Sequence, residues 1–207
     1  EDAADRNILR RRTELAAKPD DDDLRIKLVK ALAERDSDET ENEGMEILAE
    51  MLKKSNNPRH KLAIGDIKIK QMSRHLRLLR IQAKEDPDQV EAYKQLVRKR
   101  LEFELIEFTE RVKNYPTDKK WRFELGRRLF QVKRYDDAMT NFQVSKEDPK
   151  YRAASHNYLG RCYLTQKWYD EAIETLRAGL EGVTDIAGEQ AMEMQWHLMS
   201  ALMQSAA

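Results

Sequence analysis

Apolar residues recur every three or four positions along most of the chain, a spacing that predicts amphipathic α-helices. Five prolines interrupt this pattern in polar surroundings, at positions 19, 58, 87, 116 and 149. Because proline cannot continue a helix, we expect helices to begin or end at these points. The acidic run 20–23 follows the first proline and precedes an apolar series, so we expect it to cap a helix rather than to bind a metal. The chain is therefore predicted to be all-α.

Two central segments lack the internal breaks of an ordinary helix pair. Neither 66–86 nor 88–113 contains Gly, Pro or Asn, and the prolines that bound them are only 29 residues apart. Apolar residues in the first segment follow the alternating three- and four-residue spacing of a coiled-coil seam. We predict two continuous helices of about 26 residues, each about 39 Å long at the usual rise per residue, and expect them to form an antiparallel pair. The alternative is two ordinary, shortened helix pairs.

A 34-residue repeat is clear after residue 117. Leu125-Gly126 recurs as Leu159-Gly160, Tyr135 recurs as Tyr169, and the small residue Ala138 recurs as Ala172. Small residues at a fixed period allow two helices to approach closely, and the apolar residues between them would fill the seam. Three independent sequence features that share one period indicate two copies of a helix–turn–helix unit.

This segment resembles the tetratricopeptide repeat family, whose unit has 34 residues, and it resembles the bacterial members more than the eukaryotic co-chaperones. The match is strong for residues 117–182 and degenerate elsewhere. The resemblance implies a right-handed solenoid of helical hairpins, here with a central pair of long antiparallel helices. We expect an N-terminal helix at 1–18, a degenerate repeat at 20–57, the long hairpin at 58–116, repeats at 117–150 and 151–184, and the first helix of a further or capping repeat at 189–207.

The flanking repeats are recognised by weaker marks. In the degenerate N-terminal repeat we expect a polar loop at 36–43, and an insertion of about six residues near 183–188 precedes the last helix. Trp196, Met199, Ser200 and Met203 resemble the Trp-x-x-Leu-Gly-x-x-Tyr opening of a repeat. This helix is apolar, so its exposed flank needs a partner or further repeats.

In this family the first helix of each repeat lines a concave groove, so the resemblance implies a protein-binding scaffold or adaptor. Arginine beside apolar residues suits an acidic segment of a partner chain, because guanidinium pairs with carboxylate. The alternative is that these arginines pair internally with acids such as Glu124 or Asp137. The carboxylate-clamp residues of chaperone co-factors are not reproduced. The candidate groove residues are Lys120, Phe123, Arg127, Phe130, Asn157, Arg161 and Leu164.

Charge is distributed in blocks although the net charge is zero. Lys and Arg number 11 against 16 Asp and Glu in residues 1–58, 21 against 11 in 59–134, and 6 against 11 in 135–207. The basic middle block supports an alternative function, contact with nucleic-acid phosphates. The candidate contact residues are Arg74, Arg77, Arg80, Lys84, Arg98, Lys99 and Arg100.

No set of residues in the sequence predicts catalysis. The four histidines are scattered, Glu193 and His197 alone make a poor metal site, and no glycine-rich phosphate loop is present. Cys162 lies beside Gly160, where packing needs a small residue, and no base is placed near it by the sequence. We expect no enzyme activity, cofactor or metal. A single cysteine and the lack of a long apolar run favour a cytoplasmic protein without a membrane span that binds protein partners, oligomers included.

Overall fold

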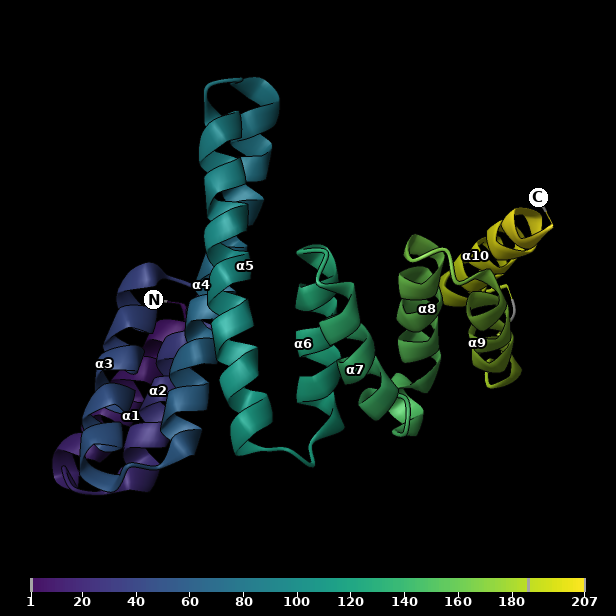
Figure 1. The fold of residues 1–207 in the computed structure, drawn as a ribbon. Coiled ribbons are helices and arrows are strands. Elements are labelled where there is room, and N and C mark those ends of the chain that lie inside the picture. The colour runs from purple at the N-terminus through teal and green to yellow at the C-terminus, as the bar shows by residue number, and fades with distance from the viewer. Residues whose placement is uncertain (1, 186, 207) are drawn as a thin grey trace. The chain divides into compact units, whose positions relative to one another are not determined.

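The computed structural model describes residues 2–185 and 187–206, and within them it contains ten α-helices and no strand (Figure 1). The all-α prediction is confirmed. Residues 1 and 207, at the ends of the predicted segments 1–18 and 189–207, lie outside the described residues, as does residue 186 of the predicted insertion. The helices are α1 (Ala3–Ala17), α2 (Asp22–Glu34), α3 (Asp38–Ser55), α4 (Pro58–Glu85), α5 (Gln89–Asn114), α6 (Lys119–Gln131), α7 (Tyr135–Ser145), α8 (Pro149–Thr165), α9 (Tyr169–Glu181) and α10 (Glu189–Ser205).

The chain divides into two compact units, residues 1–100 and 101–207. In the first unit, α1 packs on α2, α2 on α3 and α3 on α4. Ile8 of α1 packs with Leu28 and Leu32 of α2, and Val29 packs with Leu48 of α3 and Ile67 of α4. Each helix thus buries one apolar stripe against its neighbour in sequence, as the spacing predicts.

Side chains cap several helices at their N-termini. Asp21 accepts a hydrogen bond from the backbone N–H of Leu24, at 3.1 Å, so the capping role predicted for the acidic run is confirmed. Pro58 and Pro149 begin α4 and α8, where the missing proline N–H costs nothing. The loop expected at 36–43 is shorter than predicted, because Ser37 caps α3 and the helix begins at Asp38.

The prediction of two long continuous helices is confirmed. α4 has 28 residues and α5 has 26, and hydrogen bonds such as that from the Gln89 N–H to the Asp86 carbonyl, at 3.1 Å, close the tight turn between them. Figure 1 shows the chain reversing at this turn. From residue 68 to residue 103 no side chain is fully buried, so this pair of helices has no dry core of its own over that stretch.

The second unit is built from helix pairs in which glycine permits a close crossing. α6 packs on α7 and α8 on α9, and the first helices also contact one another. A Cβ atom at Gly126 would lie 2.8 Å from Phe142 Cε1, and one at Gly160 would lie 2.5 Å from Leu176 Cγ. Real Cβ atoms do not approach so closely, so both positions require glycine. The predicted equivalence of these two crossings is confirmed.

The turns within the two pairs also repeat. Lys133 and Lys167, which are 34 residues apart, both have a left-handed backbone with φ near 62°. The hydrogen bond that follows each of them is also the same, from Arg134 N–H to the Leu129 carbonyl and from Trp168 N–H to the Tyr163 carbonyl, both at 2.9 Å. The period read from the sequence therefore extends to the backbone geometry of residues 117–182.

The second half of α5 belongs to the second unit and packs on α6. The ring of Phe108 stacks on that of Trp121, with centroids 6.1 Å apart, and the buried Arg111 lies 4.6 Å over the Trp121 ring. Arg128 of α6 donates to Glu104 at 2.8 Å. Burial disfavours the charged form of Arg128, but its contacts with Glu104 and Glu124 outweigh this and raise the pKa of its guanidinium. These contacts fix the position of α6.

Candidate partner-binding surface

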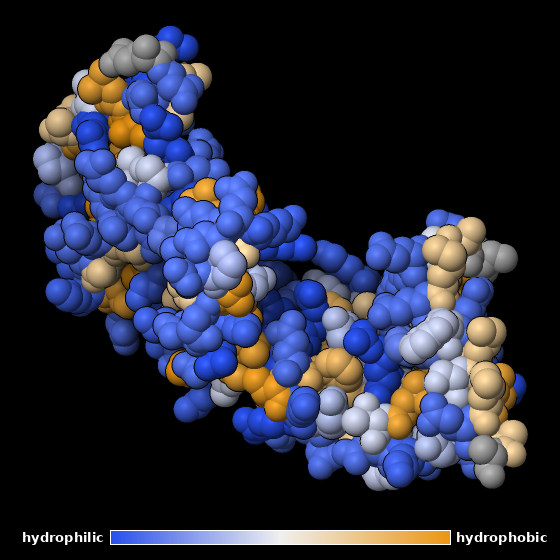
Figure 2. All heavy atoms as spheres, turned by 90° about the horizontal axis from the view of Figure 1, so that it is seen from above, coloured by the Kyte–Doolittle hydropathy of each residue, from blue (hydrophilic) through white to orange (hydrophobic). Residues whose placement is uncertain are grey.

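Charge is segregated between the first and second helices of the two clear pairs. α6 carries five Lys or Arg and one Glu, and α8 carries three Lys or Arg and no acid. By contrast, α7 carries two Asp and no base, and α9 carries four acids and one Arg. Opposite signs on alternate helices create a field directed across the array, so an acidic ligand would approach α6 and α8. Hydrophilic residues dominate the face that Figure 2 shows, as 37% charged residues require.

On α6, aromatic rings support the cationic side chains. The Arg127 guanidinium lies 5.8 Å from the centre of the Phe123 ring, and Lys120 Nζ lies 4.4 Å from that of Trp121. Arg127 also has Glu124 within 3.5 Å, as the internal-pairing alternative expects. Its side chain nevertheless keeps 39% of its surface exposed. A partly exposed ion pair of this length contributes little to stability, so Arg127 remains available to an acidic partner.

On α8, Arg161 is held more tightly. Its guanidinium lies 4.8 Å over the ring of Phe130 and 5.1 Å over that of Tyr158, and its Nη1 donates to Glu193 of α10 at 3.1 Å. The Asn157 amide donates to the other oxygen of the same carboxylate at 2.7 Å. The two α8 side chains therefore form a carboxylate-binding pair that Glu193 occupies in this structure.

The structure buries two of the side chains that the sequence assigned to partner contact. Phe123 is 8% exposed and packs on Phe142, Tyr151 and Tyr158, so its ring holds α6, α7 and α8 together. Asn157 is 4% exposed, and its Oδ1 has no hydrogen-bond partner. Both side chains lie beneath the surface, so neither offers a large exposed area for contact with a partner. The other candidates keep exposed area: Lys120, Arg127, Phe130, Arg161 and Leu164.

Sequence reasoning missed the part played by Glu193 at this surface. The spacing of Glu193 and His197 only raised the question of a metal, whereas Glu193 reaches across to α8. Burial and the nearby charge of Arg161 lower the pKa of His197 below its usual range, so the imidazole is neutral at pH 7. No pattern within α10 could reveal a partner that lies 32 residues earlier in the chain.

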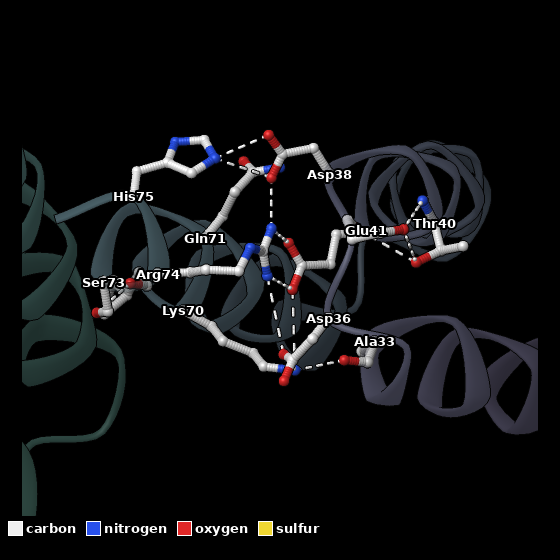
Figure 3. A network of polar contacts seen from close by, with 12 residues as sticks. Ala33, Asp36, Asp38, Thr40, Glu41, Lys70, Gln71, Ser73, Arg74 and His75 are labelled. Atoms are coloured by element: carbon white, nitrogen blue, oxygen red, sulfur yellow. Dashed lines mark hydrogen bonds and ion pairs between the residues drawn. The ribbon is translucent and has the colours of Figure 1, made fainter. Parts of the chain in front are cut away.

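The basic candidates of α4 and α5 differ in availability. Figure 3 shows the guanidinium of Arg74 pointing between Asp38 and Glu41, with Lys70 and His75 beside it. Arg74 donates to both oxygens of Glu41, at 2.7 and 2.6 Å, and also to Asp38. Glu41 is fully buried, so the charge of Arg74 ties α4 to α3, and phosphate contact by Arg74 would compete with this pairing.

The remaining basic candidates are more accessible. Arg100 is half-buried, whereas five others are exposed on the helices that flank the turn at 86–88: Arg77, Arg80, Lys84, Arg98 and Lys99. Three apolar side chains are exposed among them, Leu78, Ile81 and Val97. An exposed mixture of this kind suits a protein surface at least as well as phosphates, because exposed apolar side chains add nothing to a phosphate contact.

Other chemistry finds little support in the part of the chain that the structure describes. Cys162 is buried, and burial raises the pKa of its thiol to about 12, so the reactive thiolate is scarce at neutral pH. Among the described residues no three His, Cys, Asp or Glu side chains come together to hold a metal ion. No described helix has both the length and the apolar composition to cross a membrane.

Comparison with known proteins assigns no family to the chain. Neither a scan against models of known protein families nor a search of curated proteins finds a match. Assignment of a function therefore rests on the geometry of the chain itself.

Proposed function

We propose that this chain is a non-enzymatic scaffold of the tetratricopeptide type, and that an acidic segment of a partner protein binds to α6 and α8. The 34-residue period supports the repeat assignment, because the glycine crossings and the left-handed turns recur with it. In this proposal Arg127 and Arg161 are the anchors, a carboxylate of the partner replaces that of Glu193 on Arg161, and Lys120, Phe130 and Leu164 contact the same segment. The partner and the cytoplasmic location remain predictions.

The distribution of charge carries the proposal: bases lie on α6 and α8, acids lie on α7 and α9, and aromatic rings hold Arg127 and Arg161 in place. Rings beneath Arg127 and Arg161 reduce the freedom of these long side chains before a ligand arrives. Less entropy is then lost on binding, so each bond to a carboxylate contributes more. The contact of the Glu193 carboxylate with Arg161 and Asn157 supports an acidic ligand, because it places a carboxylate on the side chains to which we assign the partner.

Replacing both anchors by alanine should weaken binding of an acidic partner segment. A charged hydrogen bond is worth about 1.5–3 kcal/mol, so we expect the double variant Arg127→Ala/Arg161→Ala to lose at least tenfold in affinity. The measurement is fluorescence anisotropy with labelled peptides in which Glu and Leu alternate. Arg177→Ala is the control, because Arg177 is an exposed arginine of the acidic helix α9. Equal affinities for the double variant and this control would contradict the groove assignment.

A second function, nucleic-acid binding by α4 and α5, is favoured only by the exposed cations there. Its signature is salt dependence, since neutralising several phosphates releases counterions and makes affinity fall steeply with salt. Binding of single- or double-stranded nucleic acid that is lost on replacing Arg77 and Arg98, and is insensitive to Arg127→Ala, would favour this function over the peptide groove.

A further inference from the structure

The outer side of α10 is an uncovered apolar surface. Met192, Trp196, Met199 and Met203 are 54%, 62%, 58% and 75% exposed. Their spacing of four, three and four residues places them on one face of the helix, and we call these four residues the α10 stripe. The opposite side is buried at Ala191, Met194 and Ala201. Figure 2 shows apolar residues gathered at the C-terminal end of the chain, to the right of the view.

The register of this stripe matches the surface that the two earlier first helices bury. In α6, Leu125, Gly126 and Leu129 are buried, and Gly126 lies beneath Phe142 of α7. In α8, Leu159 and Gly160 are buried, and Gly160 lies beneath Leu176 of α9. The corresponding residues of α10 are Met199, Ser200 and Met203. α10 thus presents an apolar surface of the kind on which the second helix of a pair packs.

A shallow recess lies at the centre of the α10 stripe. It has a volume of about 250 Å³ and is lined by Trp196, Met199, Ser200, Met203 and Gln204. Ser200 stands where the earlier helices have glycine, and its small side chain leaves the recess open, although its Cβ prevents an approach as close as those of Phe142 and Leu176 at the glycine crossings. The nearby indole of Trp196 is left largely uncovered by the described residues, at 62% exposed.

We propose that the occupant is a second copy of this chain, with the two α10 helices packed antiparallel about a two-fold axis. Trp196 and Ser200 lie the same number of residues from position 198, so an axis at that position places each Trp196 over the Ser200 recess of the other copy. By the same count position 192 faces position 204, so Met192 lies within one residue of Met203 of the second copy. The surface is self-complementary, as an isologous interface requires.

The charge pattern favours a second copy over a charged partner. Residues 194–207 contain no Asp, Glu, Lys or Arg, although 37% of the chain is charged. A charged side chain from another protein would lose its hydration here and find no counter-charge. Two α10 helices bring no such charge to the centre of the contact.

The size of the surface predicts a weak dimer. The exposed apolar area is on the order of 500–600 Å² per chain, so a pair buries about 1,000–1,200 Å² in total, the low end for a specific interface. Affinity on the order of micromolar is expected for a contact of this size.

Sedimentation equilibrium over about 1–200 μM protein tests the proposal. We expect a monomer–dimer equilibrium that Met199→Asp weakens at least 100-fold and that Ser200→Trp, which fills the recess, also weakens. Leu9→Asp is the matched control, because Leu9 is an equally exposed apolar residue of α1, at 58%. Far-UV circular dichroism of each variant reports whether it is folded. A monomer at every concentration, or a dimer indifferent to both α10 variants, would overturn the proposal.

Cysteine cross-linking tests the antiparallel register in the otherwise unaltered stripe. Mixed Met192→Cys and Met203→Cys chains, oxidised with diamide, should form the mixed 192–203 disulfide in preference to 192–192. The buried Cys162, with its raised pKa, does not compete. Preferential 192–192 linkage, or no linkage above that of a Leu9→Cys control, would refute the antiparallel pair.

Discussion

Replacing Glu41 by alanine should lower the free energy of unfolding of the first unit by about 3 kcal/mol. Removing one partner of a buried ion pair typically costs about 3–5 kcal/mol because the other charge is left unpaired. We expect the lower end of this range, because Arg74 keeps its bond to Asp38 and is 15% exposed. Urea denaturation followed by circular dichroism measures the change.

Glu46→Ala is the control for this prediction. Glu46 lies on the same helix but is exposed, so its loss should change the free energy of unfolding by less than about 0.5 kcal/mol. Equal effects of the two substitutions would show that the buried carboxylate does not hold α3 and α4 together.

Acid should weaken the same network. The hydrogen bond and charge of Lys70 lower the pKa of Asp36. Burial opposes ionisation of Asp38, but Arg74 and His75 outweigh it and lower the pKa of that carboxyl too. A carboxyl whose pKa is lower in the folded chain adds stability above the pKa it has when unfolded, near 4, and loses that stability as pH falls through the folded value. The attachment of α4 to α3 should therefore loosen below about pH 4.

The second large effect is expected for Gly160→Ala, which should destabilise the second unit by about 1–3 kcal/mol through overpacking. The added Cβ would lie 2.5 Å from Leu176 Cγ and within 3.0 Å of both of its terminal methyl carbons. Leu176 is fully buried, so it has no space in which to withdraw. Thermal and urea denaturation measure the loss.

The control substitution for Gly160 is Gly182→Ala. A Cβ at Gly182 would have no atom within 4 Å, and its φ of −90° is open to any residue. We expect its effect to stay within about 0.5 kcal/mol. If Gly160→Ala were as mild as this control, the close crossing of α8 and α9 would not be needed for stability.

Most of the helical framework could be predicted because its determinants are local. The prolines fixed helix boundaries through the missing N–H, and the uninterrupted segments 66–86 and 88–113 became parts of single helices. The 34-residue period predicted the glycine crossings, which depend on residue size alone. The loop at 36–43 was predicted too long, because the Ser37 cap continued the helix into polar sequence.

The candidate sites were harder to predict because they depend on contacts between distant residues. Arg74 appeared as one of several surface cations, and only its distance to Glu41, 33 residues earlier, shows it to be structural. Phe123 appeared on the groove side of α6, yet rings from α7 and α8 enclose it. Glu193 likewise contacts residues of α8 that lie 32 and 36 positions earlier in the chain. Periodicity predicts the side of a helix on which a residue lies. It does not predict which charged residue of another helix contacts that side.

The two units differ in their fluorescent side chains. All three tryptophans, Trp121, Trp168 and Trp196, lie in the second unit. Indole emission should therefore report on the second unit, while ellipticity follows the helices of both units. Ellipticity is then the signal for the loss expected of Glu41→Ala, whereas both signals should report the loss expected of Gly160→Ala.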